Sequence, residues 1–196
     1  MKMIALVSKK GGVGKTLLSM GIAQKLYEAG KQVAVIDHDP EGSAMGWSFN
    51  AQENGQSLPF PVLAPVDVVA AASNDFIVVD TPPNDVATLQ QVVTRADYIV
   101  IPVLPGAGEI DRLQETVAAV ATVQDKLREG VQIGFVLNRM EHNNLAAAMP
   151  EVMKNLSYPV VAQVNKSVEY QRAFGTLIPA SLTVPFSQVL KEFDIL

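Results

Sequence analysis

The sequence predicts an α/β fold, with a doubly wound, mostly parallel sheet and helices on both faces. Apolar runs of strand length alternate along the chain with segments of helix length. The apolar runs are continuous rather than alternating, which is typical of strands buried on both faces. The 196 residues are 48% hydrophobic, so one core can form and we expect a single domain over residues 1–196.

The elements follow in order from these patterns. The expected strands, rich in Val and Ile, lie at residues 3–7, 32–37, 76–80, 98–103, 132–138 and 159–164. The expected crossover helices span residues 15–30, 85–96 and 108–130, and Gly30 and Gly130 close the first and the last as helix C-caps. Residues 50–65 are polar and contain Pro and Gly, which predicts a surface loop leading to one edge strand.

Composition excludes several classes of protein. The chain has no cysteine, which excludes thiolate metal sites, iron–sulfur clusters and disulfides. The net charge of -5 argues against a surface built wholly for nucleic acid, although a local basic patch is compatible with it. No apolar run approaches the roughly 20 residues of a membrane span, and no cleavage site follows the N-terminus, so we expect a cytoplasmic protein.

The stretch "SKKGGVGKTLLS" follows the first expected strand and opens the first helix. It nearly matches the phosphate-binding pattern G-x-x-x-x-G-K-[ST], but Lys9 stands where the first glycine belongs, and Lys10 follows it. Glycine lets the backbone N–H groups wrap a phosphate, and the helix N-terminus adds its positive dipole. Lys15 would reach the β- and γ-phosphates, and the Thr16 hydroxyl would bind magnesium. The alternative is a Gly-rich turn with an accidental lysine.

Aspartates end two expected strands, in "VAVIDHDP" and "FIVVDTPP". In an open α/β sheet, ligands bind beyond the carboxyl ends of the strands. Asp80 has the Walker B arrangement for holding magnesium-bound water, whereas Asp37 and Asp39 could hold a second such water and orient the attacking water. A single strand-end aspartate is often only a turn residue, but three around one loop favour a nucleotide site.

The segments "KKGGVGKT", "VIDHDPEGSAMGW", "VVDTPP" and "ADYIVIPVLP" together resemble the ParA/MinD family of deviant Walker A ATPases, strongly over residues 3–105 and weakly beyond. The resemblance implies a P-loop NTPase that requires ATP and Mg²⁺. It makes Lys10 the signature lysine, which crosses a dimer interface to the partner subunit's nucleotide, as an arginine finger does. Lys9 is interpreted as a solvated charge.

The resemblance also implies further site residues. The nucleotide-binding set is Lys10, Gly11, Gly12, Val13, Gly14, Lys15, Thr16, Asn138 and Pro185. Lys10, Lys15 and Asp39 would be catalytic, and Thr16, Asp37 and Asp80 would serve the metal. Thr81, Pro82 and Pro83 would form a switch that senses the γ-phosphate.

Two features limit this correspondence. Leu17 replaces the second threonine of many relatives, so a hydroxyl contact to the α-phosphate is missing. Asn138 resembles a base-contacting asparagine but could equally be a turn former.

Absences narrow the choice within the family. Without cysteine, the chain cannot be a nitrogenase iron protein, a carbon-monoxide dehydrogenase accessory ATPase or an iron–sulfur scaffold ATPase. The tail "VLKEFDIL" lacks the tyrosine cluster of the related kinases and the basic amphipathic helix of MinD. The first strand begins at Met3, so the chain is most similar to the short ParA-type partition ATPases without an N-terminal helix-turn-helix domain.

We therefore expect a slow, partner-stimulated ATPase that forms a homodimer with ATP and binds DNA non-specifically in the nucleoid. It would position a cargo such as a plasmid, a chromosome or a protein organelle, with a ParB-like or other cargo-bound protein as stimulator. Lys154, Lys166, Arg172 and Lys191 are the candidate DNA contacts, with Lys166 and Arg172 preferred; a solvated helix face is the alternative. A MinD-like membrane-associated ATPase and an enzyme resembling dethiobiotin synthetase are the alternative functions.

Overall fold

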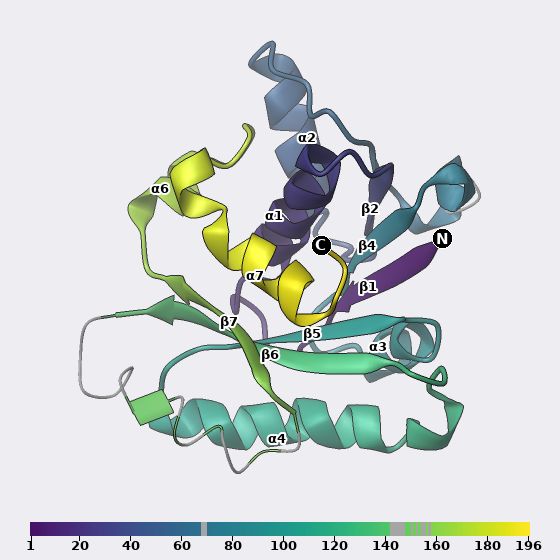
Figure 1. The fold of residues 1–196 in the computed structure, drawn as a ribbon, viewed down its shortest axis with the longest axis vertical. Coiled ribbons are helices and arrows are strands. Elements are labelled where there is room, and N and C mark those ends of the chain that lie inside the picture. Colours follow the sequence, from purple (N-terminus) through teal and green to yellow (C-terminus); the bar gives the residue numbers. More distant parts are fainter. Residues whose placement is uncertain (68–69, 142–147, 150, 152, 154–155, 157) are drawn as a thin grey trace.

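A sheet of seven strands, counted over the residues that the structure describes, forms the centre of the protein. The structure is a computed structural model that describes residues 1–67, 70–141, 148–149, 151, 153, 156 and 158–196. In these residues the strands are ordered β3-β2-β4-β1-β5-β6-β7 (Figure 1), and every neighbouring pair is parallel. Their bounds are Lys2–Leu6 for β1, Val33–Asp37 for β2, Val62–Leu63 for β3, Phe76–Asp80 for β4, Tyr98–Val103 for β5, Gln132–Met140 for β6 and Val160–Asn165 for β7. The predicted α/β fold with a parallel sheet is confirmed.

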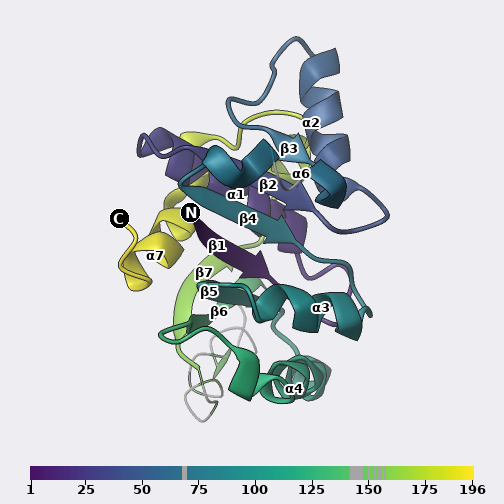
Figure 2. The same ribbon diagram turned by 90° about the vertical axis from the view of Figure 1, so that its right-hand side faces the viewer.

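Helices cover both faces of the sheet, as Figure 2 shows. Helices α1, α2, α6 and α7 lie on one face, and α3 and α4 lie on the other. Their bounds are Lys15–Glu28 for α1, Ser43–Glu53 for α2, Val86–Val93 for α3, Ala107–Ala121 for α4, Val168–Arg172 for α6 and Val184–Glu192 for α7. The molecule is thus a three-layer sandwich with an apolar core on each side of the sheet.

Successive residues of each strand enter opposite cores. In β1, Ile4 and Leu6 are fully buried against the α1 and α7 side, whereas Ala5 faces the α3 and α4 side. Because side chains alternate across a strand, a continuous apolar run satisfies both cores at once. A fully buried Ile or Leu side chain stabilises the fold by about 1.5–3 kcal/mol. The continuous Val- and Ile-rich runs therefore stabilise the sheet by filling the cores on both of its faces.

Two of the boundaries predicted from the sequence differ most from the structure. The helix predicted for residues 108–130 ends at Ala121. Thr122 there donates its hydroxyl hydrogen to the Ala119 carbonyl and accepts from Gln90 of α3, and only a short 3₁₀ turn follows at Gln124–Lys126. Residues 50–53, predicted as loop, continue helix α2, because Trp47 and Ala51 are buried in the core. The predicted edge strand is present as β3.

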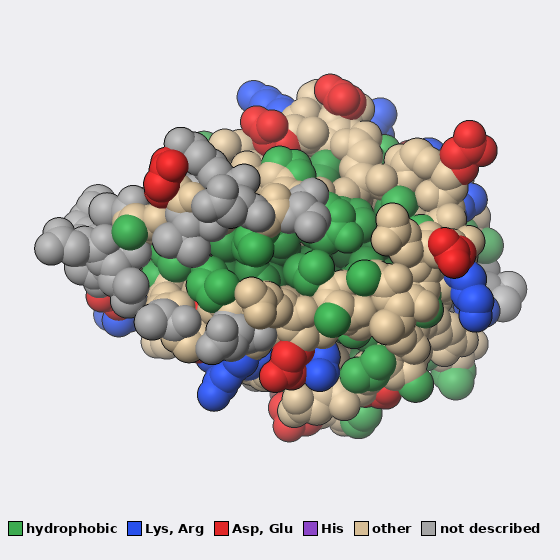
Figure 3. Space-filling model, turned by 90° about the horizontal axis from the view of Figure 1, so that it is seen from below, with side chains coloured by type: hydrophobic (Ala, Val, Ile, Leu, Met, Phe, Trp, Pro, Cys, Tyr) green, Lys and Arg blue, Asp and Glu red, His purple; other side chains and the backbone are tan. Residues whose placement is uncertain are grey.

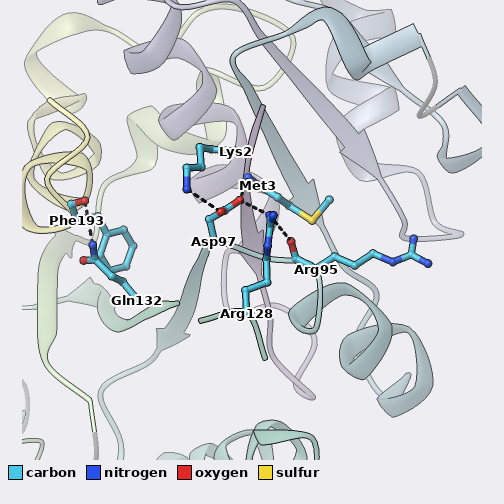
Figure 4. A network of polar contacts seen from close by, with 7 residues as sticks. All are labelled: Lys2, Met3, Arg95, Asp97, Arg128, Gln132 and Phe193. Atoms are coloured by element: carbon cyan, nitrogen blue, oxygen red, sulfur yellow. Dashed lines mark hydrogen bonds and ion pairs between the residues drawn. The ribbon is translucent and has the colours of Figure 1, made fainter. Parts of the chain in front are cut away.

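A polar network connects the amino ends of β1 and β5, at the edge of the sheet opposite the carboxyl ends of the strands (Figure 4). The Asp97 carboxylate is only 9% exposed and accepts from Lys2 Nζ at 2.9 Å, the Met3 N–H at 2.8 Å and Arg128 Nη1 at 3.0 Å. The Asp97 N–H donates in return to the Met3 carbonyl. These hydrogen bonds connect Asp97 to residues that are distant in the sequence. We therefore interpret the role of the network as structural.

Seen from the α4 side, hydrophobic side chains gather in the middle of the face and charged side chains lie toward its edges (Figure 3). No helix within the described part of the chain is long and apolar enough to cross a membrane.

Candidate functional site

The loop between β1 and α1 curls around the amino end of α1. Gly12 and Gly14 adopt left-handed backbone angles, with φ of 73° and 95°, which glycine accommodates without a steric penalty. Lys15 is the first residue of α1, and its side chain is buried, with Nζ 3.3 Å from the Lys10 carbonyl oxygen. Burial lowers the pKa of Lys15, and Asp80, Asp39 and Glu41 partly offset that shift. The loop therefore holds a cation at the entrance of a helix.

The carboxyl ends of β2 and β4 place Asp37 and Asp80 opposite each other in register. Thr16 donates its hydroxyl hydrogen to Asp80 Oδ2 at 2.6 Å, so the loop and the strand ends meet. Burial raises the pKa of Asp80 to about 7, and the Thr16 hydrogen bond partly offsets that increase. Asp37 accepts from the N–H groups of Asp39 and Met45, and it thereby holds the turn that leads into α2.

Asp80 Oδ1 is buried and makes no hydrogen bond. Such an orphaned carboxylate oxygen, next to the Thr16 hydroxyl, fits a site completed by a metal-bound water. No cluster of three or more His, Cys, Asp or Glu in the described residues could by itself hold a metal. This donor set fits Mg²⁺, which keeps several waters and takes phosphate oxygens as ligands.

The segment after β4 contacts the loop directly. Thr81 is buried and donates its hydroxyl hydrogen to the Leu6 carbonyl at 2.7 Å. A Cβ at Gly11 would lie 3.7 Å from Pro83 Cβ, so Pro83 is in van der Waals range of the loop. The Asn84 N–H donates to the Lys9 carbonyl at 2.9 Å. Thr81 of the predicted switch therefore contacts the end of β1, and Pro83 lies beside the phosphate loop.

Both lysines at the start of the loop reach α4 of the same chain. Lys10 Nζ lies 2.5 Å from Glu109 Oε1, and Lys9 Nζ lies 2.9 Å from Glu115 Oε2. The Lys9 N–H also donates to Thr116 Oγ1 at 3.1 Å. Lys9, interpreted from the sequence as a solvated charge, forms an exposed ion pair with Glu115 at the surface.

A cavity of about 230 Å³ adjoins the other side of the loop. It is lined by Gly14, Leu17, Asn138, Arg139, Asn165, Lys166, Ser167, Tyr170 and Gln171. Sequence reasoning missed Tyr170 and Gln171, since neither carries a motif and only the fold brings them to the loop. Pro185 lies near the start of α7 and does not line this cavity.

Asn138, near the carboxyl end of β6, forms a hydrogen bond with the backbone of the phosphate loop. It is 1% exposed, and its Nδ2 donates to the Val13 carbonyl at 2.7 Å while its Oδ1 accepts from the Arg139 N–H at 2.9 Å. A Cβ at Gly14 would lie 2.1 Å from Asn138 Nδ2. Both ends of the Asn138 amide are thus engaged within the chain, and its position explains why residue 14 must lack a side chain.

The preferred DNA contacts are each paired with a carboxylate. Lys166 Nζ lies 2.6 Å from Glu141 Oε1, and Arg172 Nη1 lies 2.6 Å from Glu169 Oε1 within α6. Lys191 is exposed in the last turn of α7, and Lys154 lies outside the described residues. Lys166 also lines the cavity beside Gly14 of the phosphate loop, whereas Arg172 does not line it.

Comparison with known proteins matches residues 4–179 to the family described as "CobQ/CobB/MinD/ParA nucleotide binding domain". The chain is 30% identical over 179 residues to "Maintenance of carboxysome distribution protein A" of Halothiobacillus neapolitanus, covering 87% of this chain and 82% of that protein.

Two of the solved structures that share the fold illustrate the match. The first is a Borrelia burgdorferi protein assigned to plasmid partition and bound to AMPPNP, with a TM-score of 0.79, 16% identity and 98% of each chain covered. The second is an ATP complex of McdA from Cyanothece, with a TM-score of 0.74, 19% identity, and 100% of this chain and 97% of that chain covered. At these identities the structures establish the fold alone. The family match and the Halothiobacillus relative establish that the chain belongs to the CobQ/CobB/MinD/ParA family of nucleotide-binding domains.

Proposed function

We propose that residues 1–196 form one ATPase domain that dimerises with ATP and positions a cargo. One observation carries the proposal: at the carboxyl edge of the sheet, the Lys15 ammonium lies inside the glycine-rich loop and the Thr16 hydroxyl meets Asp80. The similarity to a carboxysome distribution protein supports positioning as the use of that site. ATP and Mg²⁺ are the cofactors in this proposal.

The residues divide the work of phosphate binding. Backbone N–H groups of Gly11 to Gly14 face the phosphates, and the Lys15 ammonium, already desolvated, binds them without a large further loss of hydration. Bound Mg²⁺ supplies positive charge against the developing negative charge of phosphoryl transfer. Thr16 would hold Mg²⁺ through its hydroxyl, and Asp80 and Asp37 would hold it through water.

Asp39 positions the water that attacks the γ-phosphate. Its side chain is half-buried beside the site, and its Oδ1 accepts from the Glu41 N–H at 3.0 Å, which restricts the direction of the carboxylate. A carboxylate fixed in this way orients a nucleophilic water and receives its proton. Loss of Asp39 should therefore slow hydrolysis while leaving ATP binding intact.

The cavity of about 230 Å³ receives the base and the ribose. Leu17 and Tyr170 provide apolar walls, and Gln171 and Asn165 provide polar groups that can read the base edge. This assignment replaces the base contact expected for Pro185 and keeps Asn138 as a support of the phosphate loop.

The ATP dimer binds DNA of arbitrary sequence within the nucleoid, and a cargo-bound partner stimulates hydrolysis. Lys166 and Arg172 exchange Glu141 and Glu169 for DNA phosphates in this scheme. Two copies joined side by side present twice as many cations, which raises affinity and steepens its dependence on salt.

Light scattering with ATP and magnesium tests the dimer. Asp39→Ala should form a dimer that persists because hydrolysis is slow. Lys10→Ala in the same background should bind nucleotide but stay monomeric, whereas Lys15→Ala should lose nucleotide affinity itself. A monomeric Asp39→Ala protein that has ATP bound would contradict the sandwich dimer.

A DNA mobility-shift assay tests whether the ATP dimer binds DNA without sequence preference. Asp39→Ala with ATP should bind duplexes of unrelated sequence equally. Lys166→Glu, compared at saturating ATP because Lys166 also lines the nucleotide cavity, should weaken all of them alike. Lys126→Glu, on the 3₁₀ turn after α4, is the matched control. ATP-dependent binding to anionic vesicles with no DNA shift would instead indicate a MinD-like membrane function.

A further inference from the structure

The proposed dimer requires the Lys10 side chain to extend to the nucleotide of the partner subunit. In the structure, however, that side chain is paired with a carboxylate of its own chain. Its ammonium forms an ion pair with Glu109 on the first turn of α4, and the two side chains are only 25% and 20% exposed. A cation cannot be bound to this carboxylate and to a phosphate of the partner subunit at the same time. Dissociation of the pair is therefore part of the cost of dimerisation.

The surroundings position Glu109 for this contact. Gly106 precedes α4, and a Cβ there would lie 2.9 Å from Glu109 Cγ, so the glycine leaves room for the side chain to turn toward the loop. The Glu109 N–H donates to the Gly106 carbonyl at 3.1 Å. Local geometry thus directs the carboxylate to the phosphate loop rather than to solvent.

The neighbouring contacts anchor the backbone of the same segment. The Lys9 N–H donates to Thr116 of α4, and the Lys9 carbonyl accepts from the Asn84 N–H, which directly follows the predicted switch. Movement of the switch toward a γ-phosphate would therefore act on the residue next to Lys10. The hydrogen bond to Thr116 would keep the Lys9 backbone on α4 while the Lys10 side chain is released.

Space is available for that release. A cavity of about 250 Å³ beside Lys10 is bordered by Gly11, Asn84 and Arg112. Arg112 lies one turn after Glu109 on α4, and opposite charges at this spacing attract each other. Glu109 therefore has a second cationic neighbour once Lys10 departs.

We propose that Glu109 is a positioning residue that holds the signature lysine in its own subunit and sets the threshold for ATP-dependent dimerisation. This inference rests on the proposed function, since it presumes the ATP dimer. Glu109 therefore weakens the dimer, whereas a residue that only supports the fold would not affect its dissociation constant in this direction.

The magnitude follows from the two pairs broken per dimer. A solvent-accessible ion pair contributes about 0.2–1 kcal/mol, so removing one from each subunit lowers the dimer dissociation constant about 2-fold to 30-fold. The test uses Glu109→Gln in the Asp39→Ala background, with sedimentation measured over a range of protein concentrations in ATP and magnesium. Glu115→Gln, which removes the partner of Lys9 on the same helix, is the matched control and should leave the dimer unchanged. Glu109→Asp retains the charge and should restore part of the wild-type threshold.

A second measurement reads the pair without any dimer. Amine acetylation of the nucleotide-free protein, resolved by tandem mass spectrometry, should label Lys10 up to about fivefold faster in Glu109→Gln, because the unpaired fraction of the ammonium rises. Lys9 should be unaffected there and should respond instead to Glu115→Gln. Thermal melts of each variant exclude loss of folding.

The outcomes separate the two proposals. A tighter dimer with faster Lys10 labelling supports the role of Glu109. An unchanged or weaker dimer in Glu109→Gln, from an Asp39→Ala parent that does dimerise, overturns that role and leaves the proposed function standing. A parent that stays monomeric with ATP bound overturns the proposed dimer, and the inference with it.

Discussion

Asp80→Asn should stabilise the metal-free protein more at pH 8 than at pH 5. Burial raises the pKa of Asp80 from 3.8 to about 7, so the folded chain binds more protons than the unfolded chain between these values. Stability therefore falls as the pH rises through this window, and the full penalty is present above pH 7. Asn cannot ionise and removes the pH-dependent part of that penalty.

The size of the effect follows from the same pKa. One pKa unit corresponds to about 1.4 kcal/mol, so ionising Asp80 costs the fold about 4 kcal/mol at pH 8 and about 2 kcal/mol at pH 5. The stabilisation by Asp80→Asn should be about 2–3 kcal/mol larger at pH 8 than at pH 5. This difference does not depend on any fixed cost of burying the Asn amide, which is the same at both pH values.

Urea unfolding in EDTA at the two pH values measures the difference, with both proteins compared at each pH. Asp67→Asn, on an exposed carboxylate, is the matched control. Equal stabilisation by Asp80→Asn at pH 5 and pH 8 would refute the reasoning, since it would mean that the carboxylate pays no desolvation penalty in the folded chain.

Two further predictions concern the loop and the opposite edge of the sheet. Gly14→Ala should abolish binding of a fluorescent ATP analogue, because the new Cβ would collide with Asn138 Nδ2 and the left-handed backbone angle disfavours alanine; retained affinity would show that the loop does not need this geometry. Asp97→Ala should lower the free energy of unfolding by about 2–4 kcal/mol, because the Met3 N–H loses its acceptor and two cations lose their partner. Chemical denaturation measures this loss, with Asp125→Ala as the surface control, and a loss below about 0.5 kcal/mol would contradict the structural role of the network.

The sequence alone determined the fold class and the phosphate loop. Continuous runs of Val and Ile predict strands buried on both faces, because the spacing of apolar residues within a short segment indicates which of its faces are buried. The glycines and Lys15 are equally local, since a phosphate cradle is built from consecutive residues. The strand-end aspartates could be placed as well, because parallel strands bring their carboxyl ends to one edge of the sheet.

Only the tertiary structure decided which partners the site residues take. Glu109 and Glu115 lie about one hundred residues from the lysines that they bind, and no sequence spacing marks such a contact. Tyr170 reaches the loop because β7 and α6 bring it there, and Asn138 is engaged by the Val13 carbonyl. The boundaries of α2 and α4 also depended on long-range packing, through the burial of Trp47 and the hydrogen bond from Gln90 to Thr122. Local pattern sets the elements, whereas side-chain pairing across elements follows from how they pack.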